Sequence, residues 1–297
     1  MATKTATSVA RAAPAAIPAV KSIGFIGAGK MAQALAKGFL SAGCVRAENI
    51  WASAPSEKNF EFWHQHGCQA VHENRTIPEN CDITVLACKP PQIPSVATQI
   101  ASTELRTRLL MTVAAGVPLK TITDIIKHVP VARIMTNTAT QVCRGASSFC
   151  LTRGFTSDAE NLRIIKSLLG SISFCEEVNE SQLDAICAIS GSGIAYMFLF
   201  LEAMADAGVK VGLSRELSID LSLHTMAGAA ALAGEDRAEH KAGKAFSKGF
   251  SKLREDVCSP GGTTIHGLHK LERHGFRSVV MDAIEAATER SKELGKK

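Results

Sequence analysis

The sequence predicts an α/β protein with an N-terminal parallel-sheet domain and an all-helical C-terminal domain. In the first part of the chain, short apolar segments alternate with helical patterns, and a glycine-rich turn follows the first of these segments. Beyond Glu180 the pattern is helical almost throughout. We place the boundary near Val178, which gives a dinucleotide-binding domain over residues 21–178 and a helical domain over residues 179–297.

The glycine-rich turn follows the apolar segment Ile23 to Ile26. Gly27 permits a tight exit from a strand, and Gly29 lets the backbone approach a pyrophosphate closely. Ala32 is small enough for the next helix to pack on the sheet, and the N-terminus of that helix offers free N–H groups to phosphates. Glycine turns also cap ordinary helices, but the strand before this turn and the helical pattern after it favour a Rossmann-type dinucleotide site.

The second strand is expected over Asn49 to Ser53. In NAD-specific proteins of this architecture, an acidic residue at the end of this strand binds the adenosine ribose. Here the stretch Ser53 to Ser56 has no carboxylate, and the next acidic residue after the strand is Glu57. Hydroxyl and backbone N–H groups do not repel a 2′-phosphate, so we predict NADPH, with NADH as the alternative. We interpret three nearby histidines as surface residues and predict no metal site: His64, His66 and His72.

Three central strands are expected over Asp82 to Cys88, Arg108 to Ala115 and Val131 to Asn137. Each is apolar on both faces, which is typical of a parallel sheet covered by helices. Because the carboxyl ends of parallel strands meet at one edge, we expect the residues there to line the cofactor cleft. These residues are Ala87 to Pro90, Ala114 to Gly116 and Thr136 to Thr138.

The sheet domain is expected to close with a strand near Ser147 to Thr152, a helix that begins at a Ser157/Glu160 capping box, and a last strand over Ile172 to Val178. The helical domain that follows is rich in Ala, Leu and Met. Its apolar stripes are too extensive for internal burial, so we expect a homodimer at least.

The composition is that of an ordinary soluble protein, with 46% hydrophobic and 21% charged residues. The net charge of +5 is concentrated at the two ends and indicates no nucleic-acid partner. The longest apolar run, Ile194 to Leu201, stops at Glu202, so we expect no membrane partner. Nine cysteines without a C-x-x-C pair favour a cytoplasmic protein. We interpret residues 1–20 as a disordered leader, with a mitochondrial transit peptide as the alternative.

Two turns in the helical half contain glycine where a helical pattern would be expected. One is Ser190 to Gly193, and the other is Val257 to Thr264. Both place N–H groups and hydroxyls at the N-terminus of a helix, which suits a carboxylate. A capped helix would account for Ser259 or Thr263, but not for two glycines as well. We therefore expect a substrate that carries a carboxylate and is held next to a nicotinamide.

At these residues the sequence resembles the pyrroline-5-carboxylate reductase family over Lys21 to Leu294. The segment Asp256 to Glu272, D-V-C-S-P-G-G-T-T-I-H-G-L-H-K-L-E, is similar to the hallmark segment of that family. The motifs G-F-I-G-A-G-K-M-A, A-C-K-P, A-A-G-V, M-T-N-T, S-G-S-G and A-D-A-G-V-K-V-G-L occur in the family's order. The resemblance implies reduction of the cyclic imine 1-pyrroline-5-carboxylate to L-proline with NADPH or NADH, the last step of proline biosynthesis. It also implies an interlocked helical dimer, which in animal and plant relatives assembles into a decamer.

The resemblance further implies the cofactor site. Ile26 to Met31 would hold the pyrophosphate, and Ser53, Ser56 and Asn74 would surround the 2′-phosphate. Two strand-end loops would hold the ribose and nicotinamide, with Asn137 nearby. The implied cofactor residues are Ile26, Gly27, Ala28, Gly29, Lys30, Met31, Ser53, Ser56, Asn74, Ala87, Cys88, Lys89, Pro90, Val113, Ala114, Ala115 and Asn137.

On the substrate side, the resemblance implies that the hydroxyl of Thr264 hydrogen-bonds the ring nitrogen, which makes Thr264 the assigned catalytic residue. Hydride adds to the imine carbon while the nitrogen takes up a proton, so positioning and electrostatics suffice without a strongly basic side chain. The substrate-binding residues implied in this way are Ser259, Gly261, Gly262 and Thr263 for the carboxylate, with Glu180 and Asp256 as further lining positions.

The sequence departs from the family pattern in three places. Ile194 follows S-G-S-G, and Ala139 follows T-N-T, where proline is common in the family. The segment Glu235 to Ser251 is longer than in the relatives and rich in Lys and Ala. A family glutamate near the pocket falls in this segment, and Glu235 and Glu239 are both candidates for its place.

The sequence leaves two other functions to compare with imine reduction. A β-hydroxyacid dehydrogenase of similar build needs a general base, typically a lysine on the first helix after the boundary, and the stretch from Glu180 to Asp206 contains none. A catalytically silent NADPH-binding scaffold would have no need of the carboxylate pocket at Ser259 to Thr264. The sequence therefore favours the reductase.

Overall fold

The computed structural model describes residues 20–243 and 247–295 of the 297-residue chain. The expected leader over residues 1–20 lies outside the described residues, apart from Val20. The described chain forms two compact units. The sheet unit contains residues 20–194 together with 284–295, and the helical unit contains residues 195–283.

The sheet unit is built around a sheet that has eight strands within the described residues, in the order β3-β2-β1-β4-β5-β6-β7-β8. All neighbours are parallel except β6 and β7, which are antiparallel. The expected parallel-sheet fold is thus confirmed. The strands are β1 (Ile23–Ile26), β2 (Ile50–Ser53), β3 (Gln69–Val71), β4 (Ile83–Leu86), β5 (Leu109–Thr112), β6 (Val131–Met135), β7 (Gly145–Leu151) and β8 (Ser173–Glu177).

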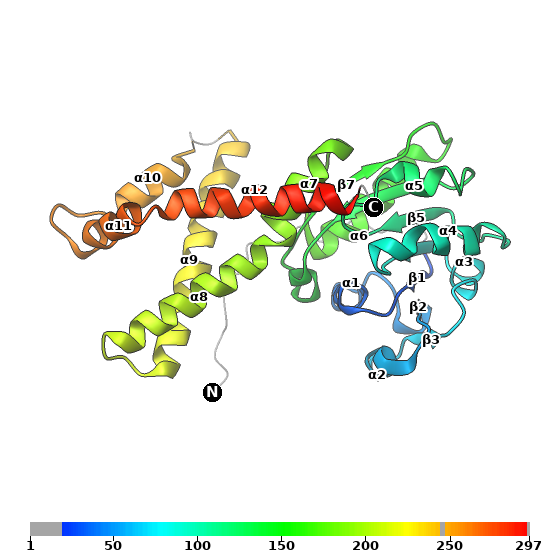
Figure 1. Ribbon diagram of the computed structural model, residues 1–297, viewed down its shortest axis with the longest axis horizontal. Helices are drawn as coiled ribbons and strands as arrows, with labels where there is room; N and C mark the ends of the chain where they lie inside the picture. Colours follow the sequence, from blue (N-terminus) through cyan, green and yellow to red (C-terminus); the bar gives the residue numbers. More distant parts are fainter. Residues whose placement is uncertain (1–19, 244–246, 296–297) are drawn as a thin grey trace. The chain divides into compact units, whose positions relative to one another are not determined.

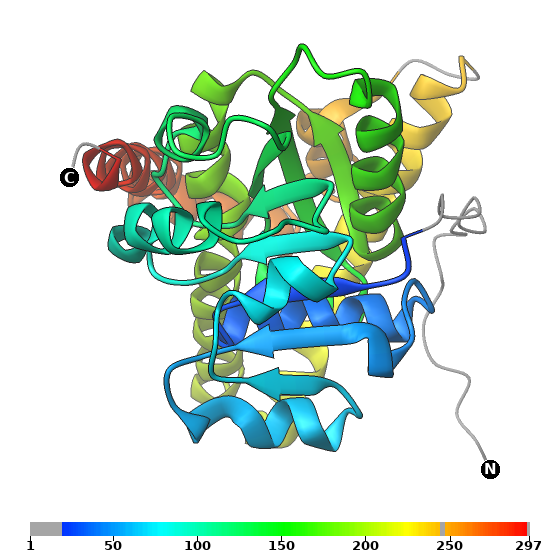
Figure 2. The same cartoon turned by 90° about the vertical axis from the view of Figure 1, so that its right-hand side faces the viewer.

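Helices cover both faces of this sheet (Figure 2) because its central strands are apolar on both sides. In β1, Phe25 faces a core with Trp63, whereas Ile26 faces a second core with Ile93. The helices of this unit are α1 (Lys30–Ser41), α2 (Phe60–Gln65), α3 (Thr76–Asn80), α4 (Ile93–Ala101), α5 (Leu119–Thr123), α6 (Asp158–Ile172) and α7 (Leu183–Ile186).

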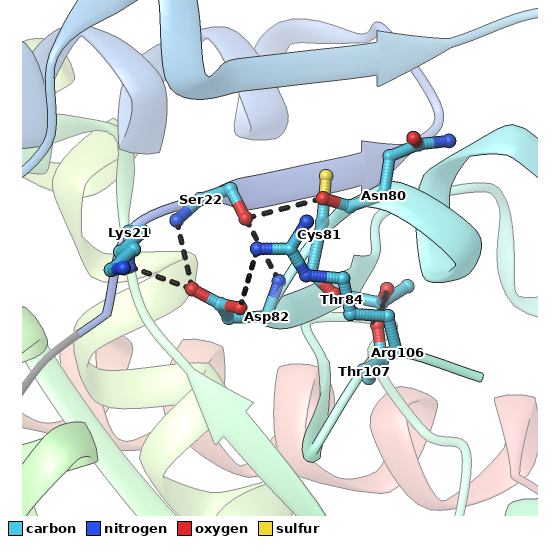
Figure 3. Close-up of polar contacts among 8 residues, drawn as sticks. All are labelled: Lys21, Ser22, Asn80, Cys81, Asp82, Thr84, Arg106 and Thr107. Atoms are coloured by element: carbon cyan, nitrogen blue, oxygen red, sulfur yellow. Dashed lines mark hydrogen bonds and ion pairs between the residues drawn. The ribbon is translucent and has the colours of Figure 1, made fainter.

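The amino end of β1 is held by a polar network on Asp82 (Figure 3). One carboxylate oxygen of Asp82 accepts hydrogen bonds from the backbone N–H groups of Lys21, at 2.7 Å, and Ser22, at 3.2 Å. Its other oxygen pairs with the guanidinium of Arg106 at 3.3 Å. These contacts fix the amino end of β1. The cofactor is expected at the other side of the sheet, where the carboxyl ends of the strands lie.

The helical unit takes its residues from the long helices labelled in Figure 1: α8 (Gly193–Lys210), α9 (Arg215–Lys241), α10 (Gly249–Asp256), α11 (Thr263–Arg273) and α12 (Phe276–Leu294). The last part of α12, residues 284–294, belongs to the sheet unit, so the chain returns to this unit after the helical unit. This division differs from the expected boundary near Val178. The helical pattern does begin there, but α7 and the end of α12 make their contacts with the sheet unit.

The helical stretch of residues 180–210 is long and apolar enough to cross a membrane by length and composition alone. The mean hydropathy of its most apolar window is 1.6, and 17% of that window is buried. The uninterrupted apolar run Ile194 to Leu201 stops at Glu202, and the helix itself continues to Lys210.

Candidate functional site

The turn after β1 brings two strand ends into close contact. Gly27 has a φ of +110°, and a Cβ at this position would lie 2.7 Å from the backbone of Ala87 and Cys88. Its N–H donates to the carbonyl of Ser53 at 2.9 Å. Glycine is therefore required here both by backbone conformation and by the lack of space. The turn joins the ends of β1, β2 and β4 at the carboxyl edge of the sheet.

The N-terminus of α1 faces this edge without a side-chain cap. Gly29 is its N-cap residue, with extended backbone and no atom within 4 Å of an ideal Cβ. The first turn of α1 contains no acidic residue and begins with Lys30. Unpaired N–H groups, a positive helix end and open space are what a pyrophosphate needs. Residues 26–31 therefore fit the phosphate-binding role that the sequence predicts.

A hydrogen-bonded chain follows the end of β2. The hydroxyl of Ser53 donates to the side-chain oxygen of Asn74 at 2.8 Å, and the amide nitrogen of Asn74 donates to the side-chain oxygen of Gln99 at 2.8 Å. The structure thus brings Ser53 and Asn74 together, and it adds Gln99 from α4. Ser56, also assigned to the 2′-phosphate, is an exposed residue just before the turn Glu57–Asn59. Sequence reasoning missed Gln99 because it lies on a helix outside the motifs.

The loops after β4 and β5 lie at the same edge. The N–H of Ala87 donates to the carbonyl of Ile26 at 2.9 Å, and the N–H of Val113 donates to the carbonyl of Leu86 at 3.1 Å. Cys88 is half-buried, and burial raises the pKa of its thiol to about 11, so the thiol stays protonated near neutral pH. Lys89 precedes the turn Pro90–Gln92. The structure thus brings both loops to the carboxyl edge of the sheet, and their contact with a ribose and a nicotinamide stays a prediction.

Asn137 is buried at the end of β6, and both ends of its side chain have protein partners. Its oxygen accepts from the N–H of Ala139 at 3.2 Å, and its nitrogen donates to the carbonyl of Ser190 at 3.0 Å. Asn137 therefore fastens the S-G-S-G turn to the sheet edge. That turn is not the free helix N-terminus expected from its glycines. Residues Cys187–Gly191 form a π-helical turn between α7 and α8, and Ser192 N–H donates to Cys187 at 2.8 Å.

Glu180, expected to line the substrate pocket, has partners within the sheet unit. One carboxylate oxygen accepts from the N–H of Leu119 at 2.7 Å and pairs with Arg133 at 3.2 Å. Arg133, whose side chain is 4% exposed, also pairs with Asp184 at 3.0 Å. A charged residue inside the apolar strand V-A-R-I-M was a sequence signal for such a buried ion pair. The role of Glu180 toward substrate stays a prediction.

The helical unit carries the other expected substrate residues. Gly261 has a φ of +67°, and a Cβ at Gly262 would overlap with the side chain of Ser259. Gly262 is the N-cap of α11, which begins at Thr263 without a side-chain cap. Thr264 is half-buried in the first turn of α11. The tight turn leaves N–H and hydroxyl groups at a helix N-terminus, an arrangement suited to a carboxylate.

Asp256, at the end of α10, is paired with two lysines of the same segment, and the start of α10 is bonded to Asp236 on α9. Lys252, at 2.9 Å, and Lys248, at 3.0 Å, pair with Asp256 and lower the pKa of its carboxyl. Asp236 on α9 accepts hydrogen bonds from the hydroxyl of Ser247, at 2.6 Å, and the N–H of Lys248, at 2.8 Å. Glu235 and Glu239 both lie on α9, so the structure leaves both as candidates for the family glutamate.

The parallel sheet, the glycine turn and the uncapped helix define a dinucleotide-binding oxidoreductase fold. Residues 22–116 match the family model described as "NADP oxidoreductase coenzyme F420-dependent", and residues 180–294 match "Pyrroline-5-carboxylate reductase dimerisation". The chain is 37% identical over 278 residues to pyrroline-5-carboxylate reductase 3 of Rattus norvegicus, covering 93% of this chain and 97% of the rat protein. It is 38% identical over 280 residues to pyrroline-5-carboxylate reductase 2 of Homo sapiens, covering 92% and 83%.

Solved structures agree with this similarity. The Plasmodium falciparum pyrroline carboxylate reductase with NADP bound aligns with a TM-score of 0.80 at 32% identity, over 94% of this chain and 99% of the other. A pyrroline-5-carboxylate reductase from Coxiella burnetii aligns with a TM-score of 0.77 at 31% identity, over 94% and 100%. The chain belongs to the pyrroline-5-carboxylate reductase family, which confirms the resemblance found in the sequence.

Proposed function

We propose that this protein reduces 1-pyrroline-5-carboxylate to L-proline with NADPH, the last step of proline biosynthesis. The observation that carries the proposal is the turn from Ser259 to Thr264, which places two glycines, three hydroxyl side chains and an uncapped helix N-terminus in one short segment. In a member of this reductase family, such a turn supplies donors for the carboxylate of a small imino acid.

The residues present fit NADPH. The phosphate-binding turn keeps open space at Gly29 and a close backbone approach at Gly27. At the end of β2, Ser53 and Asn74 offer neutral polar groups, and β2 itself carries no carboxylate that would repel a 2′-phosphate. NADPH supplies the hydride, and the loops after β4 and β5 hold its nicotinamide end through their backbone.

The chain's own contribution to the chemistry is positioning. The N–H groups at the start of α11 bind the substrate carboxylate and fix the ring. The hydroxyl of Thr264 hydrogen-bonds the ring nitrogen, where the proton is taken up as the imine is reduced. No strongly basic side chain is required, since the nitrogen becomes more basic as hydride arrives at the neighbouring carbon.

We also propose a homodimer formed by the helical unit, with further assembly into a decamer. Large apolar side chains of this unit are exposed in the single chain, among them Phe198, Leu199 and Met281 at 63%, 67% and 69%. Monomeric soluble proteins rarely expose so many. A partner subunit, rather than a membrane, is the proposed cover for the apolar stretch 180–210. Light scattering of the purified protein without detergent tests this, and a stable monomer would contradict it.

The activity is tested by following NADPH oxidation with 1-pyrroline-5-carboxylate beside a panel of β-hydroxyacids with NADP⁺. We expect turnover with 1-pyrroline-5-carboxylate and NADPH, and none with the hydroxyacids. Turnover only with a hydroxyacid would replace the proposal by a dehydrogenase. NADPH binding without turnover on any of these compounds would replace it by a cofactor-binding scaffold.

A further inference from the structure

The loop after β5 is held in place by the end of the chain. Gly116 has a φ of +75°, and a Cβ there would lie 2.9 Å from Gly295 N, Leu294 Cβ and Ser291 O. A Cβ at Gly295 would in turn overlap with the carbonyl oxygen of Gly116. Two glycines therefore allow a backbone-to-backbone contact that no other residue pair permits. All of these residues belong to the sheet unit.

A second set of contacts holds the same loop at its far end. Leu119, the first residue of α5, donates its N–H to Glu180 at 2.7 Å. Glu180 pairs with Arg133, which pairs with Asp184. Asp184 accepts a hydrogen bond from the hydroxyl of Ser291 at 2.9 Å.

The two sets of contacts share one element, the last turns of α12. Ser291 is 3% exposed, and Leu294 and Gly295 lie against Gly116. Val113 to Ala115, the residues expected at the ribose and nicotinamide, lie between the end of β5 at Thr112 and the contact at Gly116. Since hydride transfer requires the reacting atoms to be held close to their productive positions, a segment fixed by β5 on one side and by Gly116 on the other has a direct use here.

We propose that the end of α12, from Ser291 to Gly295, is a positioning element for the cofactor: it sets the place of the β5–α5 loop against the nicotinamide half of NADPH. The inference rests on the proposed function for the cofactor, but not on the identity of the substrate. Ser291, Gly295 and Gly116 act through the backbone of the loop and are positioning residues.

The experiment compares Gly116→Ala and Gly295→Ala with Gly43→Ala. Gly43 has a φ of +67°, and no atom lies within 4 Å of its ideal Cβ, so its substitution carries the same conformational cost without the contact. NADPH affinity is measured by fluorescence titration, and kcat and KM by NADPH oxidation, well below each melting temperature. We expect about tenfold weaker NADPH binding or about tenfold lower kcat in both loop variants, and less than about twofold change in Gly43→Ala. Melting temperatures are recorded for all three.

In the double variant Gly116→Ala/Gly295→Ala, the fold-loss of NADPH affinity or kcat should be smaller than the product of the two single fold-losses, because both substitutions disrupt the same contact. Ser291→Ala, which removes the side-chain hydrogen bonds of Ser291 with Asp184 and Cys187 but no backbone contact, supplies a milder variant if the glycine variants fail to fold, and it should weaken NADPH binding about two- to threefold. Lower melting temperatures with unchanged NADPH affinity and kcat would overturn the inference. Absence of NADPH binding in the unsubstituted protein would instead contradict the proposed cofactor.

Discussion

At Thr264, the proposed chemistry depends on one hydroxyl group. The Thr264→Ala variant should lower kcat about 10- to 100-fold, because a donor to the ring nitrogen is lost as charge changes there. NADPH affinity should stay within about twofold, since the residue is assigned to the substrate. Steady-state kinetics with 1-pyrroline-5-carboxylate measure both.

Thr264→Ser provides the matched control, because it keeps the hydroxyl and removes only a methyl group. It should retain most of the activity of the unsubstituted protein. Equal losses in both variants would assign Thr264 to packing rather than to the reaction.

Gln99 is expected to act on cofactor choice through Asn74. In Gln99→Leu the amide of Asn74 loses the acceptor that fixes its orientation, so KM for NADPH should rise about three- to tenfold, with little change for NADH. The neighbouring Thr98 donates only to the carbonyl of Pro94 on its own helix, so Thr98→Val is the control. A parallel rise of KM for NADPH and NADH would rule out a role of Gln99 in recognising the 2′-phosphate.

At the scale of elements, the strands with long apolar runs were predictable. β1, β2 and β4 to β6 lie within the expected segments, because central strands covered on both faces need apolar side chains at every position. The edge strand β3, with Gln69 exposed and its other two residues half-buried, gave no such signal. Its pairing with β2 depends on backbone contacts that a sequence pattern does not record.

The S-G-S-G turn differs from the sequence expectation for a related reason. Its glycines suggest a break in the helix, whereas Gly191 lies next to the side chain of Met135, with an ideal Cβ 3.4 Å from the sulfur. The π-helical turn keeps the chain helical through these residues. Small residues here permit close packing on the end of β6, and only the tertiary structure distinguishes this use of glycine from a turn.

The polar network on Asp82 at the start of β1, called the Asp82 clamp below, should make a measurable contribution to stability. Asp82→Ala leaves the N–H groups of Lys21 and Ser22 without their acceptor and removes the partner of Arg106, so the free energy of unfolding should fall by about 1–3 kcal/mol. Asp124→Ala is the control, since Asp124 forms an exposed pair with Lys120 that should contribute under about 0.5 kcal/mol. Urea unfolding measures both. Equal losses would mean that the clamp adds nothing beyond a surface ion pair.

At the scale of the whole molecule, six buried or half-buried thiols should set the alkaline limit of stability. Burial raises the pKa from 9.0 to about 11 for Cys68, Cys88 and Cys150, and to about 12 for Cys81 and Cys175; it also raises the pKa of Cys187. Because the thiols of the unfolded chain ionise at lower pH than the buried ones, the free energy of unfolding falls as pH rises above 9. The stabilisation is full below pH 9 and is lost as pH rises through 11 to 12.

Urea unfolding midpoints at pH 7, 8, 9 and 10, with a reducing agent, test this expectation. The midpoint should be steady up to about pH 8.5 and fall from pH 9 to 10. Cys68→Ala should show a shallower fall, because it removes one of the ionising groups. If the urea midpoint of this variant fell with pH as steeply as that of the unsubstituted protein, the alkaline loss of stability would come from other ionising groups.

The division of the chain into units was the part that sequence reasoning could not reach. A helical pattern after Val178 is visible in the sequence, but nothing in the composition of residues 284–295 says that they pack against the loop after β5. The backbone of Gly116 meets the backbone of Gly295 and Ser291 and the side chain of Leu294, and the Ser291 hydroxyl donates to Asp184. No sequence pattern marks these contacts. The glycine turn after β1 was predictable because the positive φ of Gly27 leaves a glycine signal in the local sequence, even though the close approach of Ala87 and Cys88 does not.

The return of α12 to the sheet unit has a consequence for the order of synthesis. When a ribosome has made residues 20–194, every described strand of the sheet exists, but the segment from Ser291 to Gly295 does not. The sheet can form while the chain is still growing. The β5–α5 loop gains its last contacts only after the whole helical unit has been translated. A nascent chain therefore completes the contacts of this loop, which is proposed to hold the nicotinamide half of NADPH, only at the end of translation, when the helices proposed for subunit assembly are already present.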